Sequence, residues 1–226
     1  MVRLCVGADG PFMAGRKTRI EEIPQALSQM EEGVKRISTI ISAIKSFSHP
    51  SKGARGPADL NRGIEDTVTI SRNEWKYAAD LVTMLSPNLP AVPCFLDQIN
   101  QVILNMIINA THAIEDSIKA GRYKKGKIII STGIREQQAL ITIRDDGAGI
   151  PSECVPRIFD PFFTTKPLGK GTGQGLSIAH DIIVQRHGGR IEVDSESGVG
   201  TTFRLFLPLK ILEPITSTST SQGEPQ

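Results

Sequence analysis

The stretch QVILNMIINATHAI, residues 101–114, decides the fold because it sets two asparagines among apolar residues at helical spacing. Asn105 and Asn109 are four residues apart, so they share one face of the helix that the pattern predicts over residues 94–119. An amide on an apolar helix is costly unless a partner satisfies it, and an Asn oxygen is a hard, neutral ligand suited to Mg²⁺. A satisfied buried amide is the structural alternative.

A second cluster is DDGAGI, residues 145–150, directly after a predicted strand. Gly147 and Gly149 let the backbone come close to a flat ligand. The Asp145 carboxylate, at the end of the strand, can accept a hydrogen bond from an exocyclic amine. An ordinary Asp-Gly turn is the alternative.

Two further clusters follow. RIFDPFFTTK, residues 157–166, holds three phenylalanines within five residues, which we interpret as anchors of a mobile segment or as a local hydrophobic plug. GKGTGQGL, residues 169–176, places alternating glycines before a predicted helix, where backbone N–H groups can face an anion. A flexible hinge is the alternative there. The stretch 121–127 spells GxxxxGK, but it leads into a strand, so we interpret it as a basic turn.

Periodicity predicts an α+β, two-layer sandwich in which helices cover one face of a sheet. The predicted helices span 60–77, 94–119 and 174–187, and the predicted strands span 80–85, 127–133, 140–144, 190–194 and 202–207.

Composition excludes several classes of protein. With 26 Lys+Arg against 24 Asp+Glu, the net charge of +2 gives no electrostatic footprint for nucleic acid. The three cysteines are far apart and form no CxxC, which fits a reducing compartment. No apolar run approaches the ~18 residues of a membrane span, and the N-terminus lacks a signal-peptide core, so we expect a cytoplasmic chain.

The N-terminal part differs from the rest. We expect residues 1–20 to be irregular and 21–49 to form a long amphipathic helix with an a/d seam, which predicts a partner helix and dimerisation. Packing on the following domain is the alternative. His49-Pro50 ends this helix, residues 50–57 are expected to be a linker, and the tail 210–226 is expected to be disordered.

In this order and spacing, the four clusters resemble the N, G1, F and G2 boxes of the GHKL ATPase superfamily, and most closely the catalytic domain of two-component sensor histidine kinases. The resemblance covers residues 58–209 and includes HGGRIEVDSESGVGTTFRLFLP near the end of the domain. VKRISTIISAIKSFSHP, residues 34–50, resembles the second helix of the dimerisation hairpin. The resemblance implies the Bergerat α/β sandwich, with ATP and Mg²⁺ as cofactors and a lid at about 155–173.

The resemblance also assigns roles. Asn109 would bind Mg²⁺, Asn105 would line the same pocket, Asp145 would accept from the adenine amine, and Thr201 would reach adenine through a water. The remaining implied contacts are Gly147, Gly149 and Ile150 at the purine; Phe159, Phe162 and Phe163 as lid anchors; Gly171, Thr172, Gly173, Gly175 and Leu176 at the hinge and phosphates; and Lys166 and Lys170 toward phosphate.

Hydrolysing members of the superfamily place Glu where this chain has Asn105, and an amide cannot take a proton from water. We therefore expect little intrinsic hydrolysis and a transfer of the γ-phosphoryl group to a protein histidine. None of His49, His112, His180 and His187 has the context of the family's phosphoacceptor. The chain thus resembles a kinase without its first hairpin helix, and self-phosphorylation is not predicted.

The expected partners are a second copy or a partner hairpin, joined through 21–49, and a response regulator or a His-bearing phosphotransfer protein. Two alternatives stay open: a non-catalytic, nucleotide-dependent interaction module, and an anti-sigma-type Ser/Thr kinase.

Overall fold

The computed structural model describes residues 30, 55–166 and 171–210. The chain divides into two units, 1–50 and 51–226, and the account below concerns the second. The expected irregular segment 1–20, the amphipathic helix 21–49 apart from Met30, the tail from residue 211 and Lys170 lie outside the described residues.

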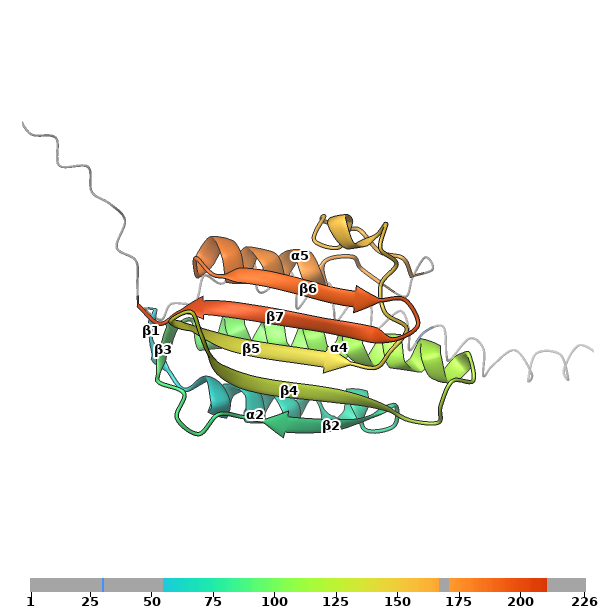
Figure 1. The fold of residues 1–226 in the computed structure, drawn as a ribbon, viewed down its shortest axis with the longest axis horizontal. Helices are drawn as coiled ribbons and strands as arrows, with labels where there is room; N and C mark the ends of the chain where they lie inside the picture. The colour runs from blue at the N-terminus through green and yellow to red at the C-terminus, as the bar shows by residue number, and fades with distance from the viewer. Residues whose placement is uncertain (1–29, 31–54, 167–170, 211–226) are drawn as a thin grey trace, which may run out of the picture. The chain divides into compact units, whose positions relative to one another are not determined.

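A five-stranded sheet in the order β2-β4-β5-β7-β6 forms one layer (Figure 1). Its strands are β2 (Ala79–Met84), β4 (Gly126–Arg135), β5 (Gln138–Asp145), β6 (Arg190–Glu196) and β7 (Gly200–Pro208). Strand β2 runs parallel to β4, and the other neighbours are antiparallel. Each of the five predicted strands is therefore present, with ends that differ by a few residues.

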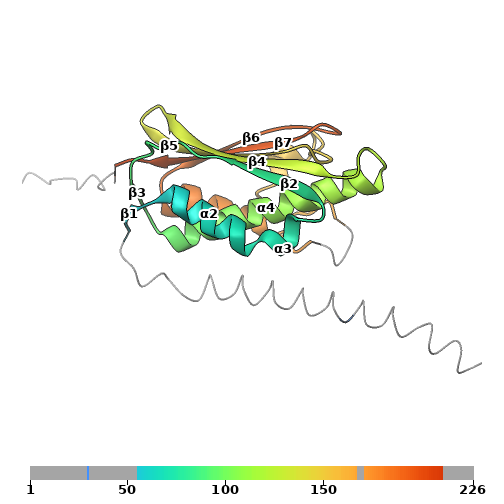
Figure 2. The same cartoon turned by 90° about the horizontal axis from the view of Figure 1, so that it is seen from below.

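The second layer consists of helices that lie on one face of the sheet (Figure 2). They are α2 (Leu60–Ile70), α3 (Arg72–Trp75), α4 (Leu96–Lys119) and α5 (Gly175–His180). Alternate residues of β4 and β5, such as Ile130 and Ile143, are fully buried, as are Ile103 and Ile107 of α4. Burying each such side chain contributes about 1.5–3 kcal/mol. The expected α+β two-layer sandwich is confirmed. Among the described residues, no helix combines the length and apolarity that crossing a bilayer requires.

Two predicted helix boundaries were wrong. The helix expected over 60–77 is interrupted at Ser71, whose N–H donates to the Thr67 carbonyl (2.9 Å) and whose hydroxyl donates to the Val68 carbonyl (3.3 Å). These bonds satisfy the end of α2 and let the chain restart as α3. The helix expected from 94 begins at Leu96.

A two-stranded ribbon was not predicted. Strand β1 (Gly56–Ala58) pairs antiparallel with β3 (Val92–Cys94), so Gly56 and Pro57 belong to a strand although we assigned them to the linker, and Cys94 precedes α4. Arg55 fixes this ribbon, because its guanidinium donates to the Pro93 carbonyl (2.8 Å) and to the His187 carbonyl (3.0 Å).

The last helix also departs from its prediction. Residues 174–187 were expected to form one helix, but α5 changes into a π-helical turn, η2 (Asp181–Arg186). His187 ends this turn and is buried: its Nδ1 donates to the Ile182 carbonyl (2.7 Å), and its Nε2 accepts from the Phe95 N–H (3.0 Å). Burial lowers the pKa of His187, which keeps the ring neutral in this arrangement.

Candidate functional site

One face of α4 contacts three segments that lie far apart in the sequence. The Asn105 side-chain amide donates to the Gly175 carbonyl (3.3 Å) at the start of α5. About two turns later, His112 Nδ1 lies 2.8 Å from Lys166 Nζ, and the carbonyl of Ala113 accepts from the Ala148 N–H (3.0 Å). Positions 105, 109, 112 and 113 share a helix face, so α4 brings the N, G1, F and G2 boxes together.

Asp145 ends β5 and is buried, with only 5% of its surface exposed. Its Oδ1 accepts from the Gly147 N–H (2.9 Å). Burial raises the pKa of Asp145 to about 6, although the N–H groups of Gly147 and Thr201 oppose the rise and the nearby Asp146 charge adds to it. At neutral pH the carboxylate is therefore mainly ionised and offers only acceptors.

Close contacts explain the glycines beside Asp145. A Cβ on Gly147 would lie 2.7 Å from the Ala113 backbone. Gly149 has a φ of +69°, and a Cβ there would lie 2.0 Å from the Glu196 carbonyl oxygen. These glycines therefore let residues 145–150 pack directly between α4 and the β6–β7 turn. Ile150, expected at the purine, is half-buried, and its N–H donates to Ser195 Oγ (2.8 Å).

The three phenylalanines behave differently from one another. The Phe159 ring packs on His180 of α5 (5.2 Å between centroids), and Arg157 covers the Phe163 ring (4.7 Å). Phe162 is 71% exposed and has a φ of +66°, so its side chain is not the buried anchor that we expected. Its backbone N–H, however, donates to the Gly173 carbonyl (3.0 Å) and joins the F box to the G2 box.

The glycine-rich segment is held against the F box by close packing. A Cβ on Gly171 would lie 2.7 Å from Thr164 Oγ1, and one on Gly173, whose φ is +65°, would lie 2.4 Å from the Phe162 backbone. Thr172 Oγ1 accepts from the Gln174 N–H (3.4 Å). Gly175 and Leu176 form the first turn of α5 and are half-buried.

Asn109, Lys166 and His112 form the charged and polar part of this face. The Asn109 side chain is half-exposed and makes no hydrogen bond within 55–166 and 171–210, which leaves its oxygen available to a ligand. Burial, and secondly the Lys166 ammonium, lower the pKa of His112 to about 4. His112 is therefore neutral at physiological pH, and its Nδ1 accepts from the Lys166 ammonium.

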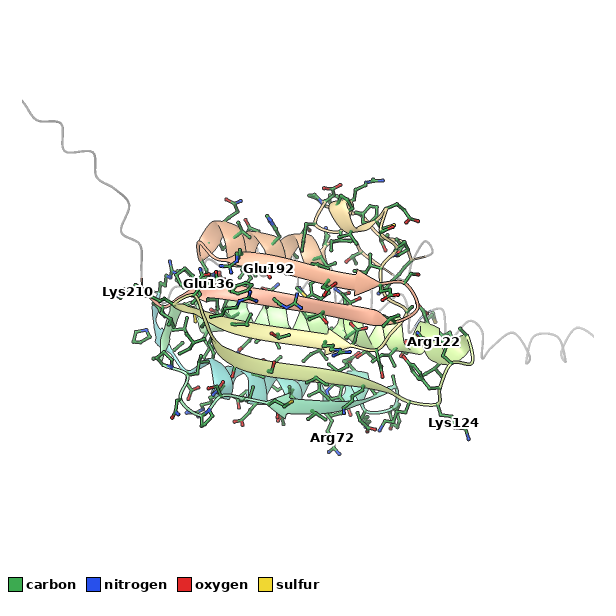
Figure 3. All side chains as sticks on the ribbon, in the orientation of Figure 1. Arg72, Arg122, Lys124, Glu136, Glu192 and Lys210 are labelled. Carbon is green, nitrogen blue, oxygen red and sulfur yellow. The ribbon has the colours of Figure 1, made fainter. Side chains whose placement is uncertain are left out.

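Sequence reasoning missed three supports of the site. Arg122, labelled beyond α4 in Figure 3, donates to the Gly147 carbonyl (3.1 Å), although we interpreted its stretch only as a basic turn. Tyr123 donates to the Asp146 carbonyl (2.7 Å). Ser195 binds the Ile150 N–H and lies 2.9 Å from Thr201 Oγ1. For Arg122, the one signal in the sequence was its position as a basic residue shortly after the N-box helix.

Comparisons with known proteins agree with this geometry. Residues 96–211 match the family described as histidine kinase-, DNA gyrase B- and HSP90-like ATPase, which is just over half of the chain. Sensor histidine kinase ZraS of Escherichia coli (strain K12) is 31% identical over 201 residues, covering 88% of this chain and 41% of ZraS. Sensory histidine kinase/phosphatase NtrB of Rhizobium leguminosarum bv. phaseoli is 31% identical over 181 residues, covering 76% of this chain and 46% of NtrB. The chain thus spans less than half the length of these curated relatives.

Among solved structures, the catalytic domain of histidine kinase ThkA matches with a TM-score of 0.57 and 29% identity. The match covers 67% of this chain and 95% of the ThkA domain. The sheet with helices on one face is thereby the fold of a known histidine kinase catalytic domain. The chain belongs to the histidine kinase-, DNA gyrase B- and HSP90-like ATPase family, and it carries an ATP-using catalytic domain of the histidine-kinase type.

Proposed function

We propose that this domain transfers the γ-phosphoryl group of Mg·ATP to a histidine of a protein in two-component signal transduction. The observation that carries the proposal is the single face of α4 that contacts Gly175, Lys166 and Ala148, because it gathers a phosphate-facing loop, a cation and the Asp145 turn. The relatives ZraS and NtrB are named as histidine kinases, which supports the same activity.

Each end of the nucleotide has a matching group. The buried Asp145 carboxylate accepts from the adenine amine, and Gly147 and Gly149 keep the backbone close to the purine. Lys166, held by His112, and the glycines 171, 173 and 175 serve the phosphates. The Asn109 amide, which makes no hydrogen bond to the described residues, would suit Mg²⁺, an ion that takes few protein ligands. When bound, Mg²⁺ neutralises phosphate charge during the transfer.

The reaction needs positioning more than acid–base catalysis by this chain. An imidazole nitrogen of the acceptor attacks the γ-phosphorus, the bond from that phosphorus to the β–γ bridging oxygen breaks, and ADP leaves with the electron pair. The imidazole loses the proton from its other nitrogen to solvent. Asn105 cannot act as a base toward water, and its amide is engaged with Gly175, which favours transfer over hydrolysis.

The acceptor histidine is expected on another segment or on a partner. Each described histidine is already used within the domain: His112 holds Lys166, His180 packs on Phe159, and His187 has both ring nitrogens in hydrogen bonds. We further propose a homodimer or partner hairpin joined through 21–49, a response regulator as the downstream partner, and a cytoplasmic location, which the free thiols of Cys94 and Cys154 support.

The test is to incubate the protein with Mg²⁺, [γ-³²P]ATP and a purified hairpin protein that bears a kinase phosphoacceptor histidine. An acid-labile, base-stable label on the hairpin, absent with the Asn109→Ala variant, is the expected result. An acid-stable label would instead favour a Ser/Thr kinase. Bound ATP without any label would favour an interaction module, and sustained phosphate release without a partner would favour a hydrolase.

A further inference from the structure

The Ser195 hydroxyl joins the two segments that flank Asp145. It accepts from the Ile150 N–H (2.8 Å), lies 3.1 Å from the Gly200 carbonyl oxygen, and lies 2.9 Å from Thr201 Oγ1. Thr201 is in register with Asp145 across β5 and β7 and is only 4% exposed. Ser195 therefore sits directly behind the pair of residues assigned to the adenine edge.

The donors and acceptors available to the Ser195 hydroxyl fix the direction of these hydrogen bonds. A serine hydroxyl donates one hydrogen bond and accepts two. The Gly200 carbonyl can only accept, so the Ser195 proton goes to it. The Ser195 oxygen then accepts from the Ile150 N–H and from the Thr201 hydroxyl, which uses all its capacity. The opposite choice, Ser195 donating to Thr201, would leave the Gly200 carbonyl without this donor.

This arrangement commits the only proton of the Thr201 hydroxyl to Ser195. Thr201 Oγ1 then offers lone pairs alone toward the adenine side, and the neighbouring Asp145 carboxylate also offers only acceptors. A 6-amino purine presents donors to such a set. A water that donates one proton to Thr201 has its second proton left for an unprotonated ring nitrogen, as in adenine. A 6-oxo purine presents a carbonyl oxygen and a protonated ring nitrogen, and both mismatch.

We infer that Ser195 is a specificity-determining positioning residue, which holds Thr201 as an acceptor so that 6-amino purine nucleotides bind in preference to 6-oxo ones. The inference rests on the proposed nucleotide site and adds to it a residue that does not itself contact the base. Removing the Ser195 hydroxyl frees the Thr201 proton, so Thr201 can donate to a purine carbonyl and the discrimination falls.

The test compares the affinities of Mg·ATP and Mg·ITP by calorimetry, because inosine differs from adenosine only at position 6 and in the proton on its adjacent ring nitrogen. Ser195→Ala is expected to lower the ATP-over-ITP preference by about tenfold, the worth of one buried hydrogen bond. Ser195→Thr, which keeps a hydroxyl, is expected to retain the wild-type preference for ATP over ITP. Ser197→Ala is the matched control, since Ser197 lies two residues further on, in the turn after β6, and is exposed.

A parallel loss of affinity for both nucleotides in Ser195→Ala would overturn the inference, because it would show a structural role only. An unchanged preference would overturn it too, while leaving the proposed function intact if Asn109→Ala abolishes ATP binding. A wild-type chain that binds no ATP would overturn both. If Ser195→Ala does not fold, Thr201→Val serves instead: it is expected to lose the preference equally, and an unaltered preference there contradicts the inference.

Discussion

The Asn105 amide donates to the carbonyl of Gly175 over 3.3 Å, so the middle of α4 is tied to the first residue of α5. This bond joins the N box to the G2 box without any ligand. It also explains how a polar residue is tolerated on a helix whose neighbours Met106 and Ile107 are buried.

Asn105→Asp is expected to weaken the domain by about 1–3 kcal/mol, because a carboxylate would face the Gly175 carbonyl with two acceptors and no donor. Urea unfolding at pH 7 measures the change. Gln101→Glu, one turn earlier on α4, introduces the same charge without that contact and is expected to stay within about 0.5 kcal/mol of wild type. Equal effects of the two variants would remove the special role of the Asn105 bond.

The raised pKa of Asp145 predicts a pH-dependent stability. Its pKa is about 6 in the folded chain against 3.8 for the ordinary group, so the folded state binds the proton more tightly. The resulting stabilisation is present at pH 4 and is lost as the pH rises to about 6. Relative to wild type, Asp145→Asn is therefore expected to gain up to about 3 kcal/mol between pH 4 and pH 7. Urea unfolding at both pH values tests this, and unfolding curves that keep a constant offset would contradict it.

The same titration predicts how ATP binding changes with pH. The adenine amine needs the ionised carboxylate, so binding is expected to release a proton near pH 6 and to weaken below it. Calorimetry in two buffers of different ionisation enthalpy measures that proton. Asp145→Asn is the control, because ionisation of the phosphates remains in it while that of residue 145 is gone. Equal proton release in both proteins would place the titrating group elsewhere.

Two glycines with a left-handed backbone allow the cost of an unfavourable φ to be measured separately from the cost of a steric clash. Gly149 and Gly188 have φ values of +69° and +62°, but only at Gly149 does a Cβ meet the backbone, 2.0 Å from the Glu196 carbonyl oxygen. Gly188→Ala is expected to cost about 1 kcal/mol and Gly149→Ala at least about 2 kcal/mol more, measured by urea unfolding. Similar losses at both positions would show that residues 145–150 yield without strain.

The contact between His112 and Lys166 predicts a titration. Because burial is the larger cause of the low His112 pKa and the Lys166 ammonium the second, Lys166→Met is expected to raise that pKa from about 4 without restoring 6.5. Nitrogen-15 chemical shifts of the imidazole measure it. Lys124→Met removes an exposed charge (Figure 3) that does not act on His112, and it is expected to leave the pKa unchanged. An unaltered pKa in Lys166→Met would contradict the contact.

The parts that sequence predicted are those with strong local patterns. Residues 101–114 are mostly apolar and carry Asn105 and Asn109 at helical spacing, so α4 could be predicted. The segments around Ile130 and Ile143 are rich in isoleucine, so the central strands could be predicted as well. The ribbon of β1 and β3 could not be, because each strand has three residues, contains a proline, and pairs with a segment more than 30 positions away.

Side-chain roles in the site divide in the same way. Asn105 and Asp145 stand in motifs whose spacing is informative. Ser195 is one serine on a strand, and its importance comes from Thr201 and Ile150, which only the folded sheet brings to it. Phe162 was expected to be an anchor like the half-buried Phe159, but its backbone is left-handed and its side chain is exposed, and composition gives no signal for that conformation.

Arg55 has a mechanical consequence. Its guanidinium hydrogen-bonds to both β3 and His187, the residue that follows η2. Strand β3 lies at the end of the sheet opposite the carboxyl end of β5 (Figure 1). Tension on the chain from the N-terminal side therefore enters at two elements at once and reaches the domain remote from Asp145. A load applied at Arg55 is thus spread over two anchor points instead of one, at a distance from the groups that we assign to the nucleotide.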